Sequence, residues 1–231
     1  MRLDKFLANA GIGSRKEVSK LIRDKQVKVE DEVINKPNHK VSYDNLITIN
    51  DEQVILEEYI YLMLNKPPGV ISSTEDGPTQ TVMELIDHPQ IDELFPVGRL
   101  DKDTTGLLII SNDGKLSHSL LSPKNKIGKT YEVDLKEDVT DEDIVKLEAG
   151  IPLKDFTSSP AIVKRVEDRK VELTIYEGKF HQVKRMFIYL NNEVVELKRL
   201  KFGNLSLDEM LEQGESRYLT DEEVNNLTQL V

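Results

Sequence analysis

The pattern of apolar residues changes character at the acidic stretch 51–58, and this change divides the chain. Before it, the apolar residues recur mainly at helical spacing; from Tyr59 onward they form short runs or alternate, as in strands. A chain of 231 residues can hold a small domain beside a larger one. We therefore expect one domain over residues 1–58, with the acidic stretch as its linker, and a second over residues 59–231.

The first domain is predicted to contain two short helices backed by a small sheet. Apolar residues recur at helical spacing over 3–10, and the glycines that follow end this helix. Ser14 and Glu17 have the spacing of a capping box and mark the start of a second helix. Valine and isoleucine on both sides of a polar turn predict a hairpin over 27–34, and 47–49 predicts another strand.

The second domain is predicted to be a mixed, largely antiparallel sheet with flanking helices, so the fold class is α+β. We expect strands over 59–64, 106–110, 131–135, 161–166, 171–176 and 194–200, and helices after Thr140, over 180–190 and over 220–230. The segment Asn65-Lys66-Pro67-Pro68-Gly69 is expected to end the first strand, because prolines and glycine oppose its continuation.

Charge is distributed unevenly. The net charge is −11, yet residues 1–28 carry eight Lys or Arg against three acids, a balance of +5, which leaves −16 for the remainder. A local basic face is what phosphate binding requires. The candidates for RNA contact are Arg2, Lys5, Arg15, Lys16, Lys20 and Arg23. A merely solvated helix face explains such a run equally well.

The loop with the densest chemistry is Gly98-Arg99-Leu100-Asp101-Lys102-Asp103-Thr104-Thr105-Gly106, placed directly before an apolar strand. Two acids, two bases and two hydroxyls lie between its glycines, and loops anchored by a buried strand often carry reactive groups. The residues alone leave a second interpretation open, a solvated turn in which Asp103 and Thr104 cap local backbone.

Several motifs resemble those of one enzyme family. Residues 98–108 strongly resemble the catalytic motif of the pseudouridine synthases, and residues 65–69 resemble the loop that opens their catalytic domain. Lys129-Thr130-Tyr131 is similar to the motif that supplies the active-site tyrosine, and residues 178–186 to the one that supplies a basic partner for the aspartate. These motifs follow one another in the family's order.

The N-terminal domain and one further motif narrow the resemblance. Arg2-Leu3-Asp4-Lys5 and Ser14-Arg15-Lys16 resemble the characteristic segments of the S4 RNA-binding domain. Leu121-Ser122-Pro123 is most similar to the branch that modifies small-subunit (16S) ribosomal RNA, the pseudouridine synthase A family. The implied partner is 16S rRNA or an assembling small subunit, although relatives with the same layout modify 23S rRNA.

The resemblance implies a role for each residue of the site. Asp101 is the catalytic carboxylate, Lys184 the cation that keeps it ionised, and Tyr131 the ring that lies against the target base. Arg99 is a candidate for reaching into the RNA stack after the uridine is flipped out. The other expected substrate contacts are His181, Gln182 and Arg185. From spacing alone, Lys184 also fits a surface lysine and Tyr131 a core tyrosine.

Neither a cofactor nor a metal has an obvious task in an isomerisation whose atoms balance. The chain has no cysteine, and its four histidines form no HxxxH or HxH pair. With no apolar run of membrane-spanning length, we expect a cytoplasmic monomer. Two other classes stay open, a non-catalytic RNA-binding protein and a glycoside hydrolase using Asp101 and Asp103.

Overall fold

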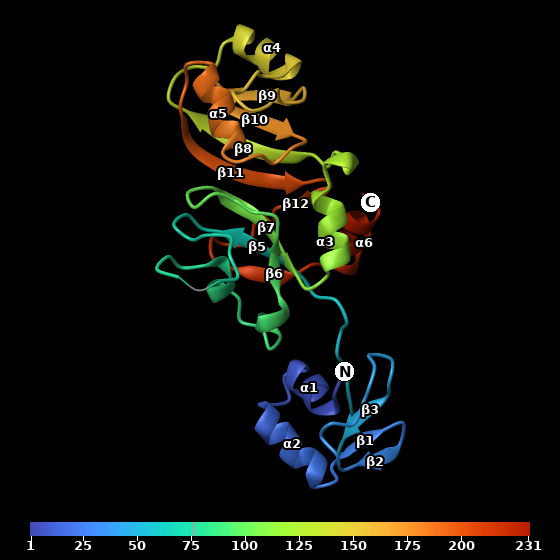
Figure 1. The fold of residues 1–231 in the computed structure, drawn as a ribbon. Coiled ribbons are helices and arrows are strands. Elements are labelled where there is room, and N and C mark those ends of the chain that lie inside the picture. The colour runs from blue at the N-terminus through green and yellow to red at the C-terminus, as the bar shows by residue number, and fades with distance from the viewer. Residues whose placement is uncertain (76) are drawn as a thin grey trace. The chain divides into compact units, whose positions relative to one another are not determined.

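The computed structural model describes residues 1–75 and 77–231 (Figure 1). Contacts divide it into two compact units, residues 1–59 with 87–93 and residues 60–86 with 94–231. Each unit has its own hydrophobic core, and each is described by itself.

The first unit packs two helices against a small antiparallel sheet. Its elements are α1 (Leu3–Asn9), α2 (Arg15–Arg23), β1 (Val27–Val29), β2 (Glu32–Ile34), β3 (Ile47–Ile49), β4 (Glu52–Val54) and the short 3₁₀ helix η2 (Ile91–Glu93). The strands lie in the order β2-β1-β3-β4. Ser14 and Glu17 form the predicted capping box at the start of α2. Neither helix is long enough to be stable alone, and both are held by a shared core that includes Phe6 and Ile22.

The prediction that residues 51–58 form a linker is wrong for its first part. Residues 52–54 form β4, which pairs with β3 through contacts that include Ile47 with Val54. Asn50 and Asp51 have φ values of 50° and 69°, which suit the tight turn of a two-residue hairpin. The acidic composition concealed this hairpin, since its apolar content is confined to one face.

The second unit is built on one mixed sheet with the strand order β13-β5-β7-β11-β8-β10-β9. Its strands are β5 (Tyr61–Lys66), β6 (Phe95–Val97), β7 (Thr105–Ser111), β8 (Lys129–Leu135), β9 (Ile162–Glu167), β10 (Lys170–Ile175), β11 (Val194–Phe202), β12 (Leu205–Ser206) and β13 (Ser216–Tyr218). Neighbouring strands are antiparallel except for the parallel pair β7 and β11. The predicted α+β class with a mixed, largely antiparallel sheet is confirmed.

Helices accompany this sheet (Figure 1). They are α3 (Gly114–Leu121), α4 (Asp141–Ala149), α5 (Gln182–Tyr189), α6 (Asp221–Thr228) and the 3₁₀ helices η1 (Val82–Leu85) and η3 (Pro123–Asn125). The helix expected over 180–190 begins later, at Gln182, because His181 has a left-handed backbone with φ of 50°. Helix α3 was missed, although Asp113 caps it by accepting a hydrogen bond from the Leu116 amide at 2.9 Å.

The end predicted for the first strand of this unit is wrong. β5 continues through Asn65 and Lys66, which pair with Leu107 and Gly106 of β7. Tertiary contacts explain the continuation, because Asn65 donates from Nδ2 to the Leu211 carbonyl at 2.7 Å and Lys66 is fully buried. Only the prolines that follow end the strand.

The parallel contact between β7 and β11 depends on one glycine. Gly106 has φ of 96°, and a Cβ added there would lie 2.3 Å from the Arg199 carbonyl oxygen. No side chain fits this approach, so the two strands meet at Gly106 and fix the loop that precedes it. That loop carries Asp101.

Candidate active site

The loop before β7 is held from beneath by Lys66. The Lys66 Nζ donates to the carbonyl oxygens of Thr104 at 2.8 Å, Pro67 at 3.1 Å and Lys102 at 3.2 Å. The Gly69 amide also donates to the Lys102 carbonyl, at 2.8 Å. Burial lowers the pKa of the Lys66 ammonium to about 8, against the pull of the nearby acids. The segment 65–69 is therefore an anchor for the loop that carries Asp101.

A second clamp holds the loop one residue before Asp101. The hydroxyl of Ser72 donates to the Leu100 carbonyl and accepts from the Leu100 amide, each at 3.1 Å. Both residues are buried, so these bonds are shielded from water. With the Lys66 contacts, they fix the backbone on either side of Asp101.

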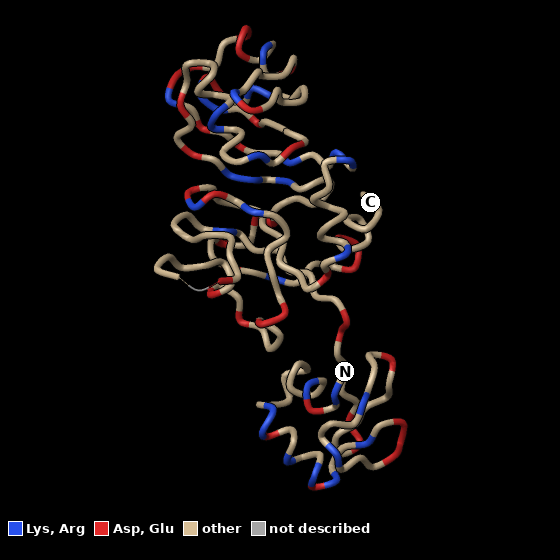
Figure 2. The backbone as a smooth tube through the Cα atoms, viewed as in Figure 1, with Lys and Arg blue, Asp and Glu red and all other residues tan. Residues whose placement is uncertain are grey.

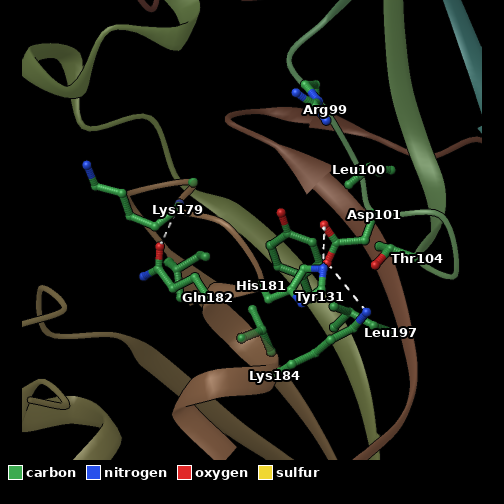
Figure 3. A pocket seen from close by; sticks show the side chains of 13 residues that line it. Arg99, Leu100, Asp101, Thr104, Tyr131, Lys179, His181, Gln182, Lys184 and Leu197 are labelled. Carbon is green, nitrogen blue, oxygen red and sulfur yellow. Dashed lines mark hydrogen bonds and ion pairs between the residues drawn. The ribbon is translucent and has the colours of Figure 1, made fainter. Parts of the chain in front are cut away.

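Asp101 lies at a pocket lined by the loop, by β8 and by the segment that leads into α5 (Figure 3). Its Oδ2 is 3.4 Å from the Lys184 Nζ, and its Oδ1 is 3.8 Å from the His181 Nε2. The Asp101 side chain is 26% exposed, so a ligand that enters the pocket can reach it. The structure thus brings Asp101, Lys184 and His181 together from segments about eighty residues apart.

Lys184 makes its shortest contact with Asp103 rather than with Asp101. The Lys184 Nζ donates to the Asp103 Oδ1 at 2.5 Å. Burial alone would raise the pKa of the Asp103 carboxyl, but the hydrogen bond and charge of Lys184 outweigh it and hold that pKa below its usual value. The interpretation of Asp103 as a local backbone cap is borne out only in part, because its carboxylate accepts from its own backbone amide but is also bound to Lys184. The sequence did not predict this contact, because Asp103 and Lys184 lie 81 residues apart.

Tyr131 is both a buried core residue and a residue of the pocket, which are the two interpretations of its position. Along β8, Lys129, Tyr131 and Val133 point to the buried face of the strand, as strict alternation requires. Tyr131 is 7% exposed, yet it lines the pocket, and its ring lies beside Asp101 (Figure 3). It is a core residue whose ring also reaches the site.

Gln182 and Arg185 hold the segment 177–185 in shape. Gln182 is buried; its Nε2 donates to Glu177 at 2.8 Å, and its Oε1 accepts from the Lys179 amide at 3.1 Å. Arg185 forms an ion pair with Asp155 and donates to the Phe180 carbonyl at 3.2 Å. Gln182 lines the pocket, whereas Arg185 is not among its lining residues. Arg99 is exposed and stands at the rim (Figure 3).

The basic residues of the first unit divide into two groups. Asp4 is buried and forms ion pairs with Arg2 at 2.8 Å and with Arg15 at 3.4 Å, while Lys5 contacts Glu93 at 2.9 Å. The three cations of this group are therefore partly neutralised. These cations stabilise the first unit through their ion pairs, and their side chains also stay partly exposed to solvent.

The second group lies along α2. Lys16, Lys20 and Arg23 are exposed and follow one another at helical spacing, opposite the buried Val18 and Ile22. Among residues 1–75 and 77–231, none of the three has a carboxylate within ion-pair distance. We call these three residues the α2 stripe; the basic segments along this helix can be followed in Figure 2.

The sequence matches the RNA pseudouridylate synthase family over residues 60–189 and the S4 domain family over residues 1–46. It is 46% identical to an uncharacterized RNA pseudouridine synthase of Bacillus subtilis, over 99% of each chain. It is 42% identical to ribosomal small subunit pseudouridine synthase A of Vibrio cholerae, over 98% of this chain and 99% of that protein. The identity to the Escherichia coli protein of the same name is 40%, over 97% and 98%.

A solved structure titled as a pseudouridylate synthase has a TM-score of 0.71 and 41% identity, and it covers 98% of this chain and 99% of that one. The chain belongs to the RNA pseudouridylate synthase family and carries an S4 domain at its N-terminus. It is an enzyme of the isomerase class, as predicted.

Two further observations concern the described residues alone. No group of three or more His, Cys, Asp or Glu side chains in 1–75 and 77–231 is arranged to hold a metal ion. No helix within the same ranges has the length and apolar content needed to cross a bilayer.

Proposed function

We propose that this chain converts one uridine of small-subunit (16S) ribosomal RNA into pseudouridine, with Asp101 as the catalytic carboxylate. The observation that carries the proposal is the position of Asp101, which lies beside Lys184 and Tyr131 on a doubly clamped loop at an open pocket. Relatives named for the small-subunit reaction match nearly the whole chain, which favours 16S over 23S RNA.

The two domains have separate tasks in this proposal. Residues 1–58 bind RNA as the S4 domain, and residues 59–231 carry out the chemistry. The α2 stripe supplies phosphate contacts, since within the described part of the chain its cations form no ion pair with a carboxylate. The expected partner is 16S rRNA or an assembling small subunit, and the compartment that follows from this substrate is the cytoplasm.

The chemistry requires that one bond break and another form between the same two partners. The C1′–N1 bond of the uridine breaks, the uracil turns, and C5 bonds to C1′; the hydrogen on C5 leaves as a proton and N1 gains one. No electrons enter or leave. Asp101 acts on the nucleotide as an ionised carboxylate, and covalent help of this kind divides one difficult step into easier ones.

The surrounding side chains keep the carboxylate ready for this step. Lys184 lies 3.4 Å from Asp101 and places a positive charge beside its carboxylate on the protein side, while RNA phosphates approach from outside. The Tyr131 ring offers a face to the extruded base, and stacking is worth roughly 1–3 kcal/mol per base. A uridine in a loop is the natural substrate, because it is flipped out at less expense than one in a duplex.

Tritium release from RNA labelled at uridine C5 tests the proposal, with Asp101→Asn as the variant and Asp103→Asn as its matched control. The isomerase releases label while base and ribose stay joined. Asp101→Asn is expected to abolish release and to bind RNA normally, whereas Asp103→Asn keeps measurable turnover. Release by Asp101→Asn would refute the assignment; free uracil would indicate a hydrolase, and binding without release a non-catalytic protein.

The RNA target is tested separately. Pseudouridine mapped in ribosomal RNA from cells that lack this protein is expected to be missing at a single 16S position. Loss from 23S RNA instead would overturn the assignment to the small subunit and leave the reaction itself untouched.

A further inference from the structure

An exposed aromatic ring stands beside the pocket without taking part in its lining. Phe180 is 74% exposed, although burying a phenylalanine side chain would stabilise the fold. One face of its ring stacks on His181, with centroids 3.7 Å apart and planes 18° from parallel. The opposite face is therefore open to solvent.

The stack is connected directly to the catalytic carboxylate. The His181 Nε2 lies 3.8 Å from the Asp101 Oδ1, and the Phe180 ring forms the next layer beyond the imidazole. The 3.7 Å between the rings is close to the ~3.4 Å that separates successive nucleotides of one strand in a stacked helix. Phe180 thus lies one stacking distance from His181, which itself lines the pocket beside Asp101.

The backbone around the ring is held in a conformation that is unfavourable for a residue other than glycine. His181 has φ of 50°, a left-handed conformation that is uncommon for residues other than glycine. The Phe180 carbonyl accepts from the Arg185 Nη1 at 3.2 Å, and Arg185 is itself held by Asp155. The exposed ring is consequently presented in one place rather than on a free loop.

The surroundings favour nucleic acid as the occupant. Lys179 precedes the ring and is exposed, and Arg99 is exposed at the pocket rim. A flat aromatic face among cations is the arrangement that binds single-stranded RNA, because every base has a face to stack and a phosphate beside it. An apolar protein surface would offer no partner for the charges of Lys179 and Arg99.

We propose that Phe180 is a substrate-binding residue whose outer face stacks on the base adjacent to the target uridine. Extrusion of the uridine leaves its neighbour without a stacking partner, and the Phe180 ring replaces that partner. The inference rests on the proposed function, since it takes the nucleotide at Asp101 to be the extruded uridine. It adds a contact outside the pocket that holds the neighbour in place.

The test measures RNA binding in the Asp101→Asn background, where turnover does not interfere. The probe is the 16S hairpin that contains the mapped uridine, with 2-aminopurine placed at the 5′ or the 3′ neighbour. Stacking on Phe180 quenches the emission of one of these probes when RNA binds. Phe180→Ala is expected to remove this quenching and to raise Kd roughly 5- to 100-fold.

Two further variants separate stacking from general effects. Phe180→Trp keeps an aromatic face and is expected to restore both quenching and affinity. Val145→Ala removes an apolar side chain of similar exposure on α4, 65%, and is expected to leave both unchanged. Since Phe180 is exposed, none of these variants should lower the melting temperature.

Unchanged affinity and persistent quenching in Phe180→Ala would overturn the inference and would point to a protein partner or a bare surface ring instead. A marked fall in melting temperature would overturn it as well, because the ring would then serve packing. Tritium release by the parent enzyme keeps the two questions apart. If the parent releases label and Phe180→Ala binds normally, only the inference about Phe180 fails.

Discussion

Replacing Lys66 by methionine is expected to weaken catalysis while leaving the stability of the fold nearly unchanged. Lys66 is fully buried, and its ammonium donates to the carbonyl oxygens of Pro67, Lys102 and Thr104. Two of these acceptors belong to the loop that carries Asp101. Methionine fills a similar volume but donates no hydrogen bond, so the loop loses its anchor.

Two opposing effects determine the stability of the Lys66→Met variant. Burial lowers the pKa of Lys66 from 10.5 to about 8, so holding its charge at neutral pH costs about 3 kcal/mol, at about 1.4 kcal/mol per pKa unit. Methionine removes this cost. The loss of donors to buried carbonyls opposes the gain by about 1–3 kcal/mol, and the Lys102 carbonyl keeps the Gly69 amide as a partner. At pH 7 the free energy of unfolding should change by less than about 2 kcal/mol.

The sign of the pH dependence follows from the lowered pKa. Between about 8 and 10.5 the unfolded chain holds a proton on Lys66 that the folded chain has released. The unfolded state binds more protons there, so this residue makes stability rise with pH across that window. Lys129, whose pKa burial also lowers to about 8, contributes in the same direction and is present in both proteins.

Urea unfolding of the parent and of Lys66→Met at pH 7, 9 and 10.5 measures the contribution of Lys66 as a difference. The parent should gain stability relative to the variant as pH rises, by up to about 3 kcal/mol. Tritium release at pH 7 should fall at least tenfold in the variant. Identical pH profiles of the two proteins, or full activity of the variant, would refute the account of Lys66 as a charged anchor.

Two other predictions concern cations, first Lys184, which binds a carboxylate, and then the α2 stripe, whose residues form no ion pair in the described part of the chain. Lys184→Met should abolish tritium release and yet cost only about 1 kcal/mol in urea unfolding, because Asp103 is 72% exposed and water replaces the lysine there; a cost of 3 kcal/mol or more would contradict this. Replacing Lys16, Lys20 and Arg23 of the α2 stripe by glutamine should lower the slope of log Kd against log salt by about 2, with turnover at saturation unchanged. Arg2→Gln is the control; it should reduce stability through Asp4 and hardly alter the slope, and a loss of about 0.7, the value of one full phosphate contact, would reject the division of cations.

Much of the fold could be predicted because its signals are local. The capping box at Ser14, the neighbouring strands β9 and β10 and the continuous apolar run of β7 each depend on residues close in sequence. The short strands β4, β6 and β13 lack such signals, since each has three residues and exists through pairing with a neighbouring strand. For these strands the pairing partner determines the conformation.

The residues of the site also divide into those that local motifs indicated and those whose contacts depend on distant parts of the chain. Its motifs indicated Asp101, Tyr131 and Lys184, which the structure brings together at one pocket. The burial of Lys66 could not be predicted, because two of its acceptors lie 36 and 38 residues further along the chain. The contact of Lys184 with Asp103 spans 81 residues and is equally invisible to spacing.

The placement of cations also explains how a chain of net charge −11 can bind RNA. The six basic candidates of the first unit look alike in sequence, but acids already contact Arg2, Lys5 and Arg15. The phosphate contacts expected from these six residues therefore number about three, which is why the predicted change in salt slope is about 2 at ~0.7 per phosphate of a single strand. A low slope is compatible with a specific enzyme, since the acids that pair with the other cations limit binding to RNA in general.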